Sequence, residues 1–346
     1  MSEYLPITLA TYLHDIDPYA IKLWDGGPIR WYGLSYLAGF FIAYLLIKRV
    51  VTVGVSTLDP KRAADFVVAV CIGIVIGGRI GYVLFYKIEL LTDFTDDLPF
   101  WGVLMINKGG MASHGGILGG ILATWWYARR HKLSWPHLLD LMAFSAPIGL
   151  CLGRIANFIN GELLGRPCNP NFPLAVKFPQ EIFDWSHEDA VLLQPVVERA
   201  RELLPRYAEH GTYELLPIIV DAVQSGNEQL ATMLEPLLTA RHPSQLYAAA
   251  LEGLVVFIVL ALSWIKPRRP LVIGGMFCAT YAVMRIFDEF FREPDAHIGY
   301  EALGLTRGQW LSVLLLIAGI VQIVIFSRRN VQSMGGWRGV VQHDGG

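Results

Sequence analysis

An arginine, two asparagines and a glutamate stand at the end of a long apolar run in this 346-residue chain. They lie in the stretch 153–166, which reads Gly-Arg-Ile-Ala-Asn-Phe-Ile-Asn-Gly-Glu-Leu-Leu-Gly-Arg. A charged group at membrane depth costs about 3 kcal/mol at the centre of a span, and such groups mark cavities that handle polar ligands. The stretch therefore predicts a site for a polar ligand at the edge of a bilayer.

The spacing within this stretch indicates what the ligand is. On an ideal helix Arg154, Asn157 and Gly161 share a face, whereas Asn160 points elsewhere. Gly161 indicates that the helix ends there, which would free main-chain N–H groups beside the arginine. A guanidinium with spare amide donors suits a phosphate. The alternative is that Arg154 pairs with Glu162 only to hold the loop, as structural ion pairs do.

A second polar stripe lies in a later apolar run. Its members follow one another at i, i+4, i+8 and i+11: Tyr281, Arg285, Glu289 and Arg292. Arg285 and Glu289 are spaced to pair directly. A stripe this polar cannot face lipid, so it is expected to line the protein interior. An interfacial charge ladder is the alternative, and it explains Arg292 better than Arg285.

Two histidines begin apolar runs. His114 lies in Gly-Gly-Met-Ala-Ser-His-Gly-Gly, where the glycines allow a backbone or ligand to approach closely. A lone histidine is usually a satisfied polar residue, but His114 shares its expected depth with two arginines, which favours function. His242 precedes Pro243, which suits the first turn of a helix. For His242 a structural role is the favoured interpretation.

The composition identifies the class of protein. The chain is 53% hydrophobic and 17% charged, whereas a soluble protein carries about a quarter charged residues. Apolar runs near spanning length alternate with short charged connectors, so we expect an all-α polytopic membrane protein without a cleaved signal peptide. The net charge of −2 gives no indication of nucleic-acid binding. The four cysteines have no metal-like spacing, and no cofactor or nucleotide motif is present, so neither metal nor cofactor is expected.

Seven spans are predicted, each near the ~20 residues that a bilayer requires. They are 31–51, 64–86, 110–128, 137–158, 245–265, 271–291 and 309–327. Lys and Arg gather in the connectors after the first, third, fifth and seventh spans, so the N-terminus is expected outside and the C-terminus inside. Glycine pairs at small-xxx-small spacing in the second and third spans predict close helix packing.

This orientation brings the unusual polar residues to one leaflet. Six of them fall at outer helix ends: Tyr32, Arg79, His114, Arg154, His242 and Arg285. A transporter more often carries such residues at the midplane, so we expect one site facing the outer leaflet. The long 163–244 segment, with amphipathic patterns near 188–204 and 228–238, is expected to form a small extracytoplasmic head; a solvated insertion is the alternative. The predicted division is 1–162 with an N-terminal outer segment and the first four spans, 163–244 as the head, 245–329 with the last three spans, and 330–346 as a disordered cytoplasmic tail.

At these residues the chain resembles the bacterial prolipoprotein diacylglyceryl transferases. The family signature Gly-Arg-x-(Gly/Ala)-Asn-Phe-x-Asn-x-Glu-x-x-Gly matches from Gly153 through Gly165. Further matching segments occur in the same order: Trp31-Tyr32-Gly33-Leu34, Gly77-Gly78-Arg79-Ile80-Gly81-Tyr82, His114-Gly115-Gly116, Arg241-His242-Pro243-Ser244-Gln245-Leu246-Tyr247, and Arg285 to Asp295. The resemblance covers the whole membrane part. The segment at 167–240 is longer than usual for the family, so acceptor docking is the least transferable feature.

The resemblance implies an enzyme of the bacterial inner or plasma membrane. Such enzymes move the diacylglyceryl group of phosphatidylglycerol to the lipobox cysteine of a preprolipoprotein, and glycerol phosphate is released. The first step of lipoprotein maturation is thereby implied, with phosphatidylglycerol, the lipobox peptide and the bilayer as partners. The alternatives are another outer-leaflet phospholipid headgroup transferase or hydrolase, and a non-enzymatic lipid transporter.

The resemblance also implies roles for residues. Arg154 and Arg285 are assigned to the headgroup and leaving phosphate, and His114 is the candidate base or orienting residue. The supporting substrate contacts are Tyr32, Arg79, Asn157, Glu162, His242, Tyr281, Glu289 and Arg292. Among these, Tyr32 is placed at the mouth of the lipid pocket, while Tyr281 and Glu289 orient Arg285.

Overall fold

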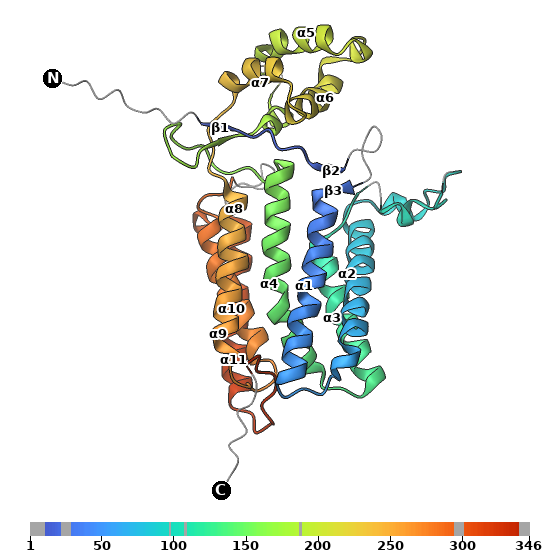
Figure 1. The fold of residues 1–346 in the computed structure, drawn as a ribbon, viewed down its shortest axis with the longest axis vertical. Coiled ribbons are helices and arrows are strands. Elements are labelled where there is room, and N and C mark those ends of the chain that lie inside the picture. Colours follow the sequence, from blue (N-terminus) through green and yellow to red (C-terminus); the bar gives the residue numbers. More distant parts are fainter. Residues whose placement is uncertain are drawn as a thin grey trace, which may run out of the picture. The chain divides into compact units, whose positions relative to one another are not determined.

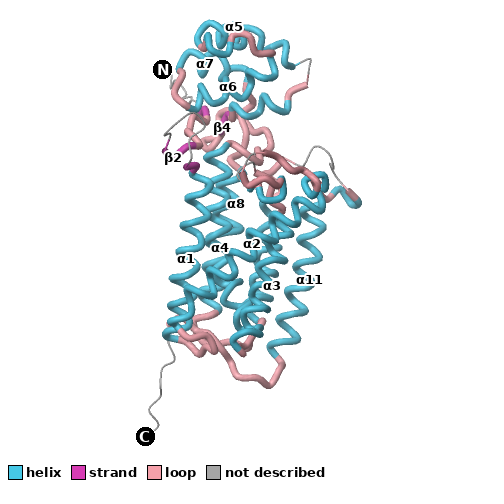
Figure 2. The backbone as a smooth tube through the Cα atoms, turned by 90° about the vertical axis from the view of Figure 1, so that its right-hand side faces the viewer, coloured by secondary structure: helices cyan, strands magenta, loops and turns pink. Residues whose placement is uncertain are grey.

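The protein is seen in a computed structural model that describes residues 11–21, 29–96, 98–106, 109–186, 189–293 and 301–338. Helices and loops make up most of these residues, and the strands are short (Figure 2). The chain forms two compact units. Unit 1 comprises Met1–Ala38, Gly149–Val255 and Tyr281–Leu314, and unit 2 comprises Gly39–Ile148, Val256–Thr280 and Leu315–Gly346.

Each of the seven predicted spans overlaps an observed helix (Figure 1). These are α1 (Trp31–Val53), α2 (Ala63–Phe85), α3 (Ser113–His131), α4 (Trp135–Asn160), α8 and α9 (Ser244–Ala248 and Val256–Ser263), α10 (Val272–Asp288) and α11 (Arg307–Ser327). A π-helix, Ala249–Val255, joins α8 to α9 without a break. In the described part of the chain, five helical stretches are long and apolar enough to cross a membrane. They are Trp31–Val53, Pro60–Phe85, Trp135–Asn160, Ser244–Ser263 and Arg307–Ser327.

The chain is therefore a mostly helical, multi-pass membrane protein with five candidate spans among its described residues. The helices α3 and α10 are not among the five. The 17 residues of α10 fall short of the ~20 that a span requires. The hydropathy of α3 is lowered by its two ends. Its last turn contains three basic residues, Arg129, Arg130 and His131, and six of its first eight residues are small or polar.

Within unit 2, α2 and α3 pack side by side through their glycines. A Cβ atom added at Gly77 would lie 2.4 Å from the main-chain oxygen of Gly115, so the two backbones approach too closely for any side chain. This contact is the close packing that the small-xxx-small spacing predicts. The start of α10 is held in the same unit by Asp140 of α4, whose carboxylate accepts hydrogen bonds from the N–H groups of Leu271 and Gly274, each 2.7 Å long.

The C-terminal segment of unit 2 is described as far as residue 338. The main chain of Met334 exchanges hydrogen bonds with Arg268, and Gly335 does the same with Val55. The indole of Trp337 donates to the Ala261 carbonyl at 2.7 Å. Residues 330–338, which were expected in a disordered tail, instead pair with the ends of helices, and residues 339–346 lie outside the described part.

Unit 1 contains the strands and three short helices of the 163–244 segment. The strand β1 (Tyr12–Leu13) pairs in parallel with β4 (Val176–Lys177), and β2 (Tyr19–Ile21) pairs antiparallel with β3 (Ile29–Arg30). The helices are α5 (Gln194–Leu203), α6 (Thr212–Gln224) and α7 (Glu228–Leu234). The two amphipathic patterns correspond to α5 and α7, whereas α6 was not predicted.

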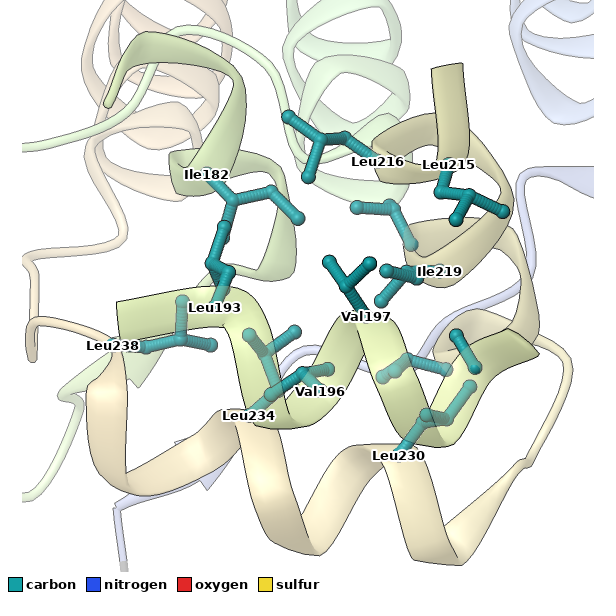
Figure 3. Packing of buried hydrophobic residues seen from close by; sticks show 13 residues of the cluster. Ile182, Leu193, Val196, Val197, Leu215, Leu216, Ile219, Leu230, Leu234 and Leu238 are labelled. Carbon is teal, nitrogen blue, oxygen red and sulfur yellow. The ribbon is translucent and has the colours of Figure 1, made fainter. Parts of the chain in front are cut away.

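These three helices surround a small apolar core of their own (Figure 3). Val197 of α5 and Ile219 of α6 point into it, and both side chains are fully buried. Leu230 and Leu234 of α7 close it from the third side. The 163–244 segment is therefore a packed helical body rather than an extended loop.

Candidate active site

Two arginines predicted to bind phosphate meet at one buried carboxylate in unit 1. Arg154 comes from α4, Arg285 from α10, and Glu252 from the π-helix between α8 and α9. The Nε and Nη2 atoms of Arg154 donate to Oε2 of Glu252 at 3.2 and 2.9 Å. Arg285 Nη1 donates to Oε1 of the same carboxylate at 3.0 Å. Glu252 is fully buried, so its two oxygens hold the guanidinium groups at a fixed separation.

Further carboxylates surround Arg285. Its Nη1 atom also donates to Asp288 at 2.8 Å, and its Nη2 atom donates to Glu289. The hydroxyl of Thr306 donates to the second oxygen of Glu289 at 2.8 Å, which fixes that carboxylate in turn. Tyr281 completes the group, because its hydroxyl lies 3.4 Å from Oε2 of Glu252.

From the sequence, Glu289 was the one carboxylate expected to pair with these arginines, apart from the alternative partner Glu162. The structure instead places Glu252, Asp288 and Glu289 around two arginines. Sequence reasoning missed Glu252 because it stands in an apolar run with no polar neighbour within four residues on either side. The available signal was its isolation, since a carboxylate alone in a span needs a buried partner. Removing one partner from such a buried group leaves an uncompensated charge, at a cost of about 3–5 kcal/mol.

The end of α4 forms a second polar group beside this cluster. Asn157 donates to one carboxylate oxygen of Glu162 at 2.9 Å, and Asn160 donates to the other at 3.1 Å. Gly161 has a φ angle of +68°, which turns the chain back and carries Glu162 over the helix end. The expectation that Asn160 points elsewhere is wrong, because Glu162 folds back to a position that both amides reach.

Two other expectations about this helix end also change. Arg154 does not pair with Glu162, which was the alternative to a ligand site. Arg154 bonds to Glu252, and Glu162 bonds to the two asparagines. The main-chain N–H groups expected to be spare are used within the turn. Gly161 N–H donates to Phe158 and Glu162 N–H to Asn157, both at 3.0 Å.

Two basic side chains anchor the loop that follows the signature. Arg166 donates to the carbonyl groups of Arg292 and Glu289 at 2.9 and 3.2 Å. Arg241 donates to the Gly165 carbonyl at 3.0 Å and pairs with Glu181 and Glu293. Burial alone would lower the pKa of Arg241, but the two carboxylates outweigh burial and raise that pKa. The loop is thus fastened to the chain beyond α10 and cannot move independently of it.

The remaining predicted contacts of unit 1 lie in other surroundings. Tyr32 is the second residue of α1, and its ring packs edge-on against Tyr36 with a centroid distance of 5.2 Å. The His242 ring is wedged between Phe172 and Phe291, with centroid distances of 5.1 and 5.4 Å. Its Nδ1 atom lies 3.4 Å from the hydroxyl of Tyr247. These contacts agree with the structural role favoured for His242.

The predicted residues Arg79 and His114 belong to unit 2. Arg79 is 5% exposed, and its guanidinium donates to four main-chain carbonyls at 2.6–3.0 Å. They are those of Gly102, Val103, Gly109 and Gly110. A guanidinium has five N–H groups, so Arg79 is committed to the loop that leads into α3. His114 is the second residue of α3, and its side chain is exposed.

Comparison with known proteins identifies the chain. The family model described as prolipoprotein diacylglyceryl transferase matches residues 18–325. The chain belongs to this family. A phosphatidylglycerol–prolipoprotein diacylglyceryl transferase of Bdellovibrio bacteriovorus is 46% identical over 341 residues, which cover 94% of this chain and 97% of that protein. The protein of the same description from Neisseria gonorrhoeae is 38% identical over 321 residues, covering 92% and 98%. That of Paraburkholderia phymatum is 38% identical over 326 residues, covering 92% and 96%.

Family membership settles the class of reaction. The chain is a prolipoprotein diacylglyceryl transferase, a membrane enzyme of lipoprotein biosynthesis. The resemblance noted in the sequence is therefore confirmed. The two arginines and the carboxylate between them now need a role within diacylglyceryl transfer.

Proposed function

We propose that this enzyme takes the diacylglyceryl group from phosphatidylglycerol and transfers it to the lipobox cysteine of a preprolipoprotein. The relatives carry both the donor and the acceptor class in their names. The observation that carries the proposal is the pair of arginines, Arg154 and Arg285, held on opposite oxygens of the buried Glu252. Two guanidinium groups fixed at one carboxylate are positioned to hold a phosphate oxygen cluster of similar charge and geometry.

The reaction balances without a cofactor. The cysteine thiol loses its proton to a base, and its sulfur attacks the glyceryl carbon that carries the phosphate. The carbon–oxygen bond breaks with its electron pair going to the phosphate, a carbon–sulfur thioether bond forms, and glycerol phosphate leaves. The leaving phosphate gains negative charge, so guanidinium donors already in place stabilise the transition state. The nucleophile comes from the substrate, so the reaction needs no cysteine of the enzyme.

Arg154 is the residue we assign to the phosphate first. Its Nε and Nη2 atoms are spent on Glu252, and its side chain keeps 19% of its surface exposed. We assign the Nη1 atom to a phosphate oxygen. Arg285 is 12% exposed and bonds to three carboxylates, so its role is chiefly to supply positive charge behind Glu252. Asn157 and Glu162 support the same headgroup, while Tyr281 and Glu289 orient Arg285.

His114 remains the candidate base or orienting residue for the acceptor thiol. A free thiol has a pKa of about 8.5, so a neighbouring base raises the fraction that is reactive. Exposure of His114 on α3 leaves it accessible to a substrate. Arg79 is reassigned, because its N–H groups hold the loop before α3 and so position His114 instead of binding phosphate. Tyr32, His242 and Arg292 are retained as contacts at the periphery of the lipid site.

The finer topology is also part of the proposal. We infer that α3 and α10 cross the membrane together with the five candidate spans, so that seven helices place the N-terminus outside and the C-terminus inside. The distribution of Lys and Arg among the connectors supports this orientation. The 163–244 segment is then an extracytoplasmic head, and the site faces the outer leaflet of the bacterial plasma membrane.

The test uses membranes that contain the protein, phosphatidylglycerol labelled in its diacylglyceryl group, and a lipobox peptide. Label is expected on the peptide and not on a peptide whose lipobox cysteine is alanine. Release of a labelled lipid without peptide labelling would indicate a headgroup hydrolase and would overturn the proposal. Transfer of label to the alanine peptide would exclude the cysteine as acceptor.

A further inference from the structure

Three side-chain amides converge on the turn that ends α4. Asn160 Nδ2 donates to the Glu162 carboxylate at 3.1 Å. Gln180 Nε2 donates to the Asn160 carbonyl at 3.1 Å, and Gln245 Nε2 donates to the Glu162 carbonyl at 2.5 Å. The three amides come from α4, from the 163–244 segment and from α8, yet all of them bond to residues 160–162.

Each of these amides leaves its oxygen buried and unused. Asn160 Oδ1, Gln180 Oε1 and Gln245 Oε1 accept no hydrogen bond from the residues that the structure describes. Gln245 as a whole is only 2% exposed. Exchanging oxygen and nitrogen in any of the amides would not help, because each nitrogen faces a carbonyl or carboxylate and must remain the donor. The three oxygens are therefore fixed as acceptors.

Buried acceptors without donors are costly, at about 1–3 kcal/mol each, so a cluster of them points to a ligand that brings donors. The position of the cluster restricts that ligand. Gln180 Oε1 lies directly over Gly161, 2.3 Å from where a Cβ would stand. Arg154 is two turns before this glycine and Asn157 one turn after Arg154, a rise of about 5 Å per turn. A ligand that is anchored by a phosphate on Arg154 and extends toward the end of α4 would bring its donors to these oxygens.

We propose that Asn160, Gln180 and Gln245 form a subsite for the hydroxyl groups of the headgroup glycerol of the lipid donor. The subsite rests on the proposed function, since it presumes a phosphate at Arg154. A glycerol phosphate headgroup offers an anionic phosphate for the arginine and two hydroxyl donors for the amide oxygens. Because a site built to hydrogen-bond a hydroxyl rejects an analogue that lacks it, these oxygens select lipids by the headgroup beyond the phosphate.

The experiment compares two lipids in each of three proteins. The lipids are phosphatidylglycerol and phosphatidylpropanol, which has the same headgroup length but no hydroxyl. The proteins are the wild type, Gln180→Met, and the control Gln229→Met on α7, whose glutamine bonds to Arg199 in the 163–244 segment. The readout is kcat/KM for labelling of the lipobox peptide, and its ratio between the two lipids.

In the wild type we expect phosphatidylglycerol to be favoured by at least tenfold, as befits lost hydrogen bonds to buried acceptors. Gln180→Met should lower kcat/KM for phosphatidylglycerol by about tenfold and leave that for phosphatidylpropanol within about twofold. Gln229→Met should leave both values unchanged. The phosphatidylpropanol activity shows that the variant is folded.

Other results would overturn the inference in distinguishable ways. Equal use of the two lipids by the wild type would remove the subsite and leave the proposed function intact. An equal loss on both lipids in Gln180→Met would make the glutamine a merely structural residue. A change confined to the KM for the peptide would show that the oxygens receive peptide N–H groups instead. Labelling by neither lipid in the wild type would contradict the proposed function itself.

Discussion

Arginines in the two units differ in the kind of group to which they are hydrogen-bonded. In unit 1, Arg154 and Arg285 bond to the carboxylate of Glu252. In unit 2, Arg79 bonds to four main-chain carbonyls. Glu252 occupies the Nε and Nη2 atoms of Arg154 and leaves Nη1 for the phosphate that we propose, whereas the four carbonyls use all three nitrogen atoms of Arg79. We therefore propose that Arg154 binds a ligand and that Arg79 is structural.

The largest effect is expected from Glu252→Gln. The substitution leaves Arg154 without its carboxylate partner and removes one of the three carboxylates that bond to Arg285. Glu252 is fully buried, so water cannot replace the lost charge. We expect a loss of about 3–5 kcal/mol in stability. The measurement is thermal unfolding in detergent, and added phosphatidylglycerol should restore part of the lost stability because its phosphate replaces the missing charge. An unchanged melting temperature would show that Glu252 is not the counter-ion of these arginines.

Arg154→Lys tests the ligand-binding side of the comparison. A lysine keeps the charge but cannot hold Glu252 and a phosphate together, since it lacks the planar fork. Activity should fall by about 100- to 1,000-fold, the scale for losing one donor to a transition-state oxyanion. Peptide labelling at saturating lipid measures the fall in kcat. Full activity in a stable protein would exclude Arg154 from the chemistry.

A buried histidine of unit 1, His14, sharpens the contrast, because it lies in an apolar setting and is neutral in the folded protein. The ring of His14 packs against Phe158 and Phe178, 5.2 Å from each, and the residue is fully buried. Burial lowers the pKa of His14 to about 4. In the unfolded chain the imidazole takes up a proton as the pH falls through 6.5, whereas in the folded chain it stays neutral until about pH 4. The contribution of His14 to the free energy of unfolding is therefore complete above pH 6.5 and is lost as the pH falls toward 4.

The total loss at His14 is about 3 kcal/mol. It should appear as faster hydrogen exchange of β1 and β4 at acidic pH. His14 follows β1, and its main-chain N–H donates to the main-chain carbonyl of Lys177 in β4 at 2.8 Å. The variant His14→Phe keeps the aromatic packing and has no proton to bind. Its exchange rates, corrected for the intrinsic effect of pH, should be flat over the same range, and a slope equal to that of the wild type would assign the effect to another group.

The smallest effect is expected from Arg79→Lys. One ammonium cannot replace four carbonyl contacts, so the loop before α3 should loosen and His114 should lose its fixed position. We expect about a tenfold fall in kcat, the effect of weakened positioning, with little change in the KM for phosphatidylglycerol. A large rise in that KM would instead make Arg79 a lipid ligand. Arg154→Lys in parallel provides the contrast, since its loss should exceed that of Arg79→Lys.

Much of the candidate site was accessible from residue spacing. Arg285 and Glu289 were grouped by helical periodicity, and they form a hydrogen-bonded pair. Arg154 and Asn157 were grouped in the same way, but they bond to different carboxylates, Glu252 and Glu162. The role of Glu252 was not accessible, because its partners are 98 and 33 residues away. The contact of Asn160 with Glu162 was not accessible either, because the turn at Gly161 carries Glu162 back to a position that both asparagines reach.

The sequence by itself determined the class of protein, the positions of its long apolar helices and the family. The length of an apolar run and the spacing of a signature can be read from neighbouring residues. Because polar groups are costly in lipid, few sequences other than membrane spans show these patterns. Only the tertiary structure decided which carboxylate each arginine meets, that Arg79 serves a loop, and that three amides share the end of α4. These outcomes depend on which helices pack together and on how their ends turn, and pairs so distant in the chain leave no periodic trace in it.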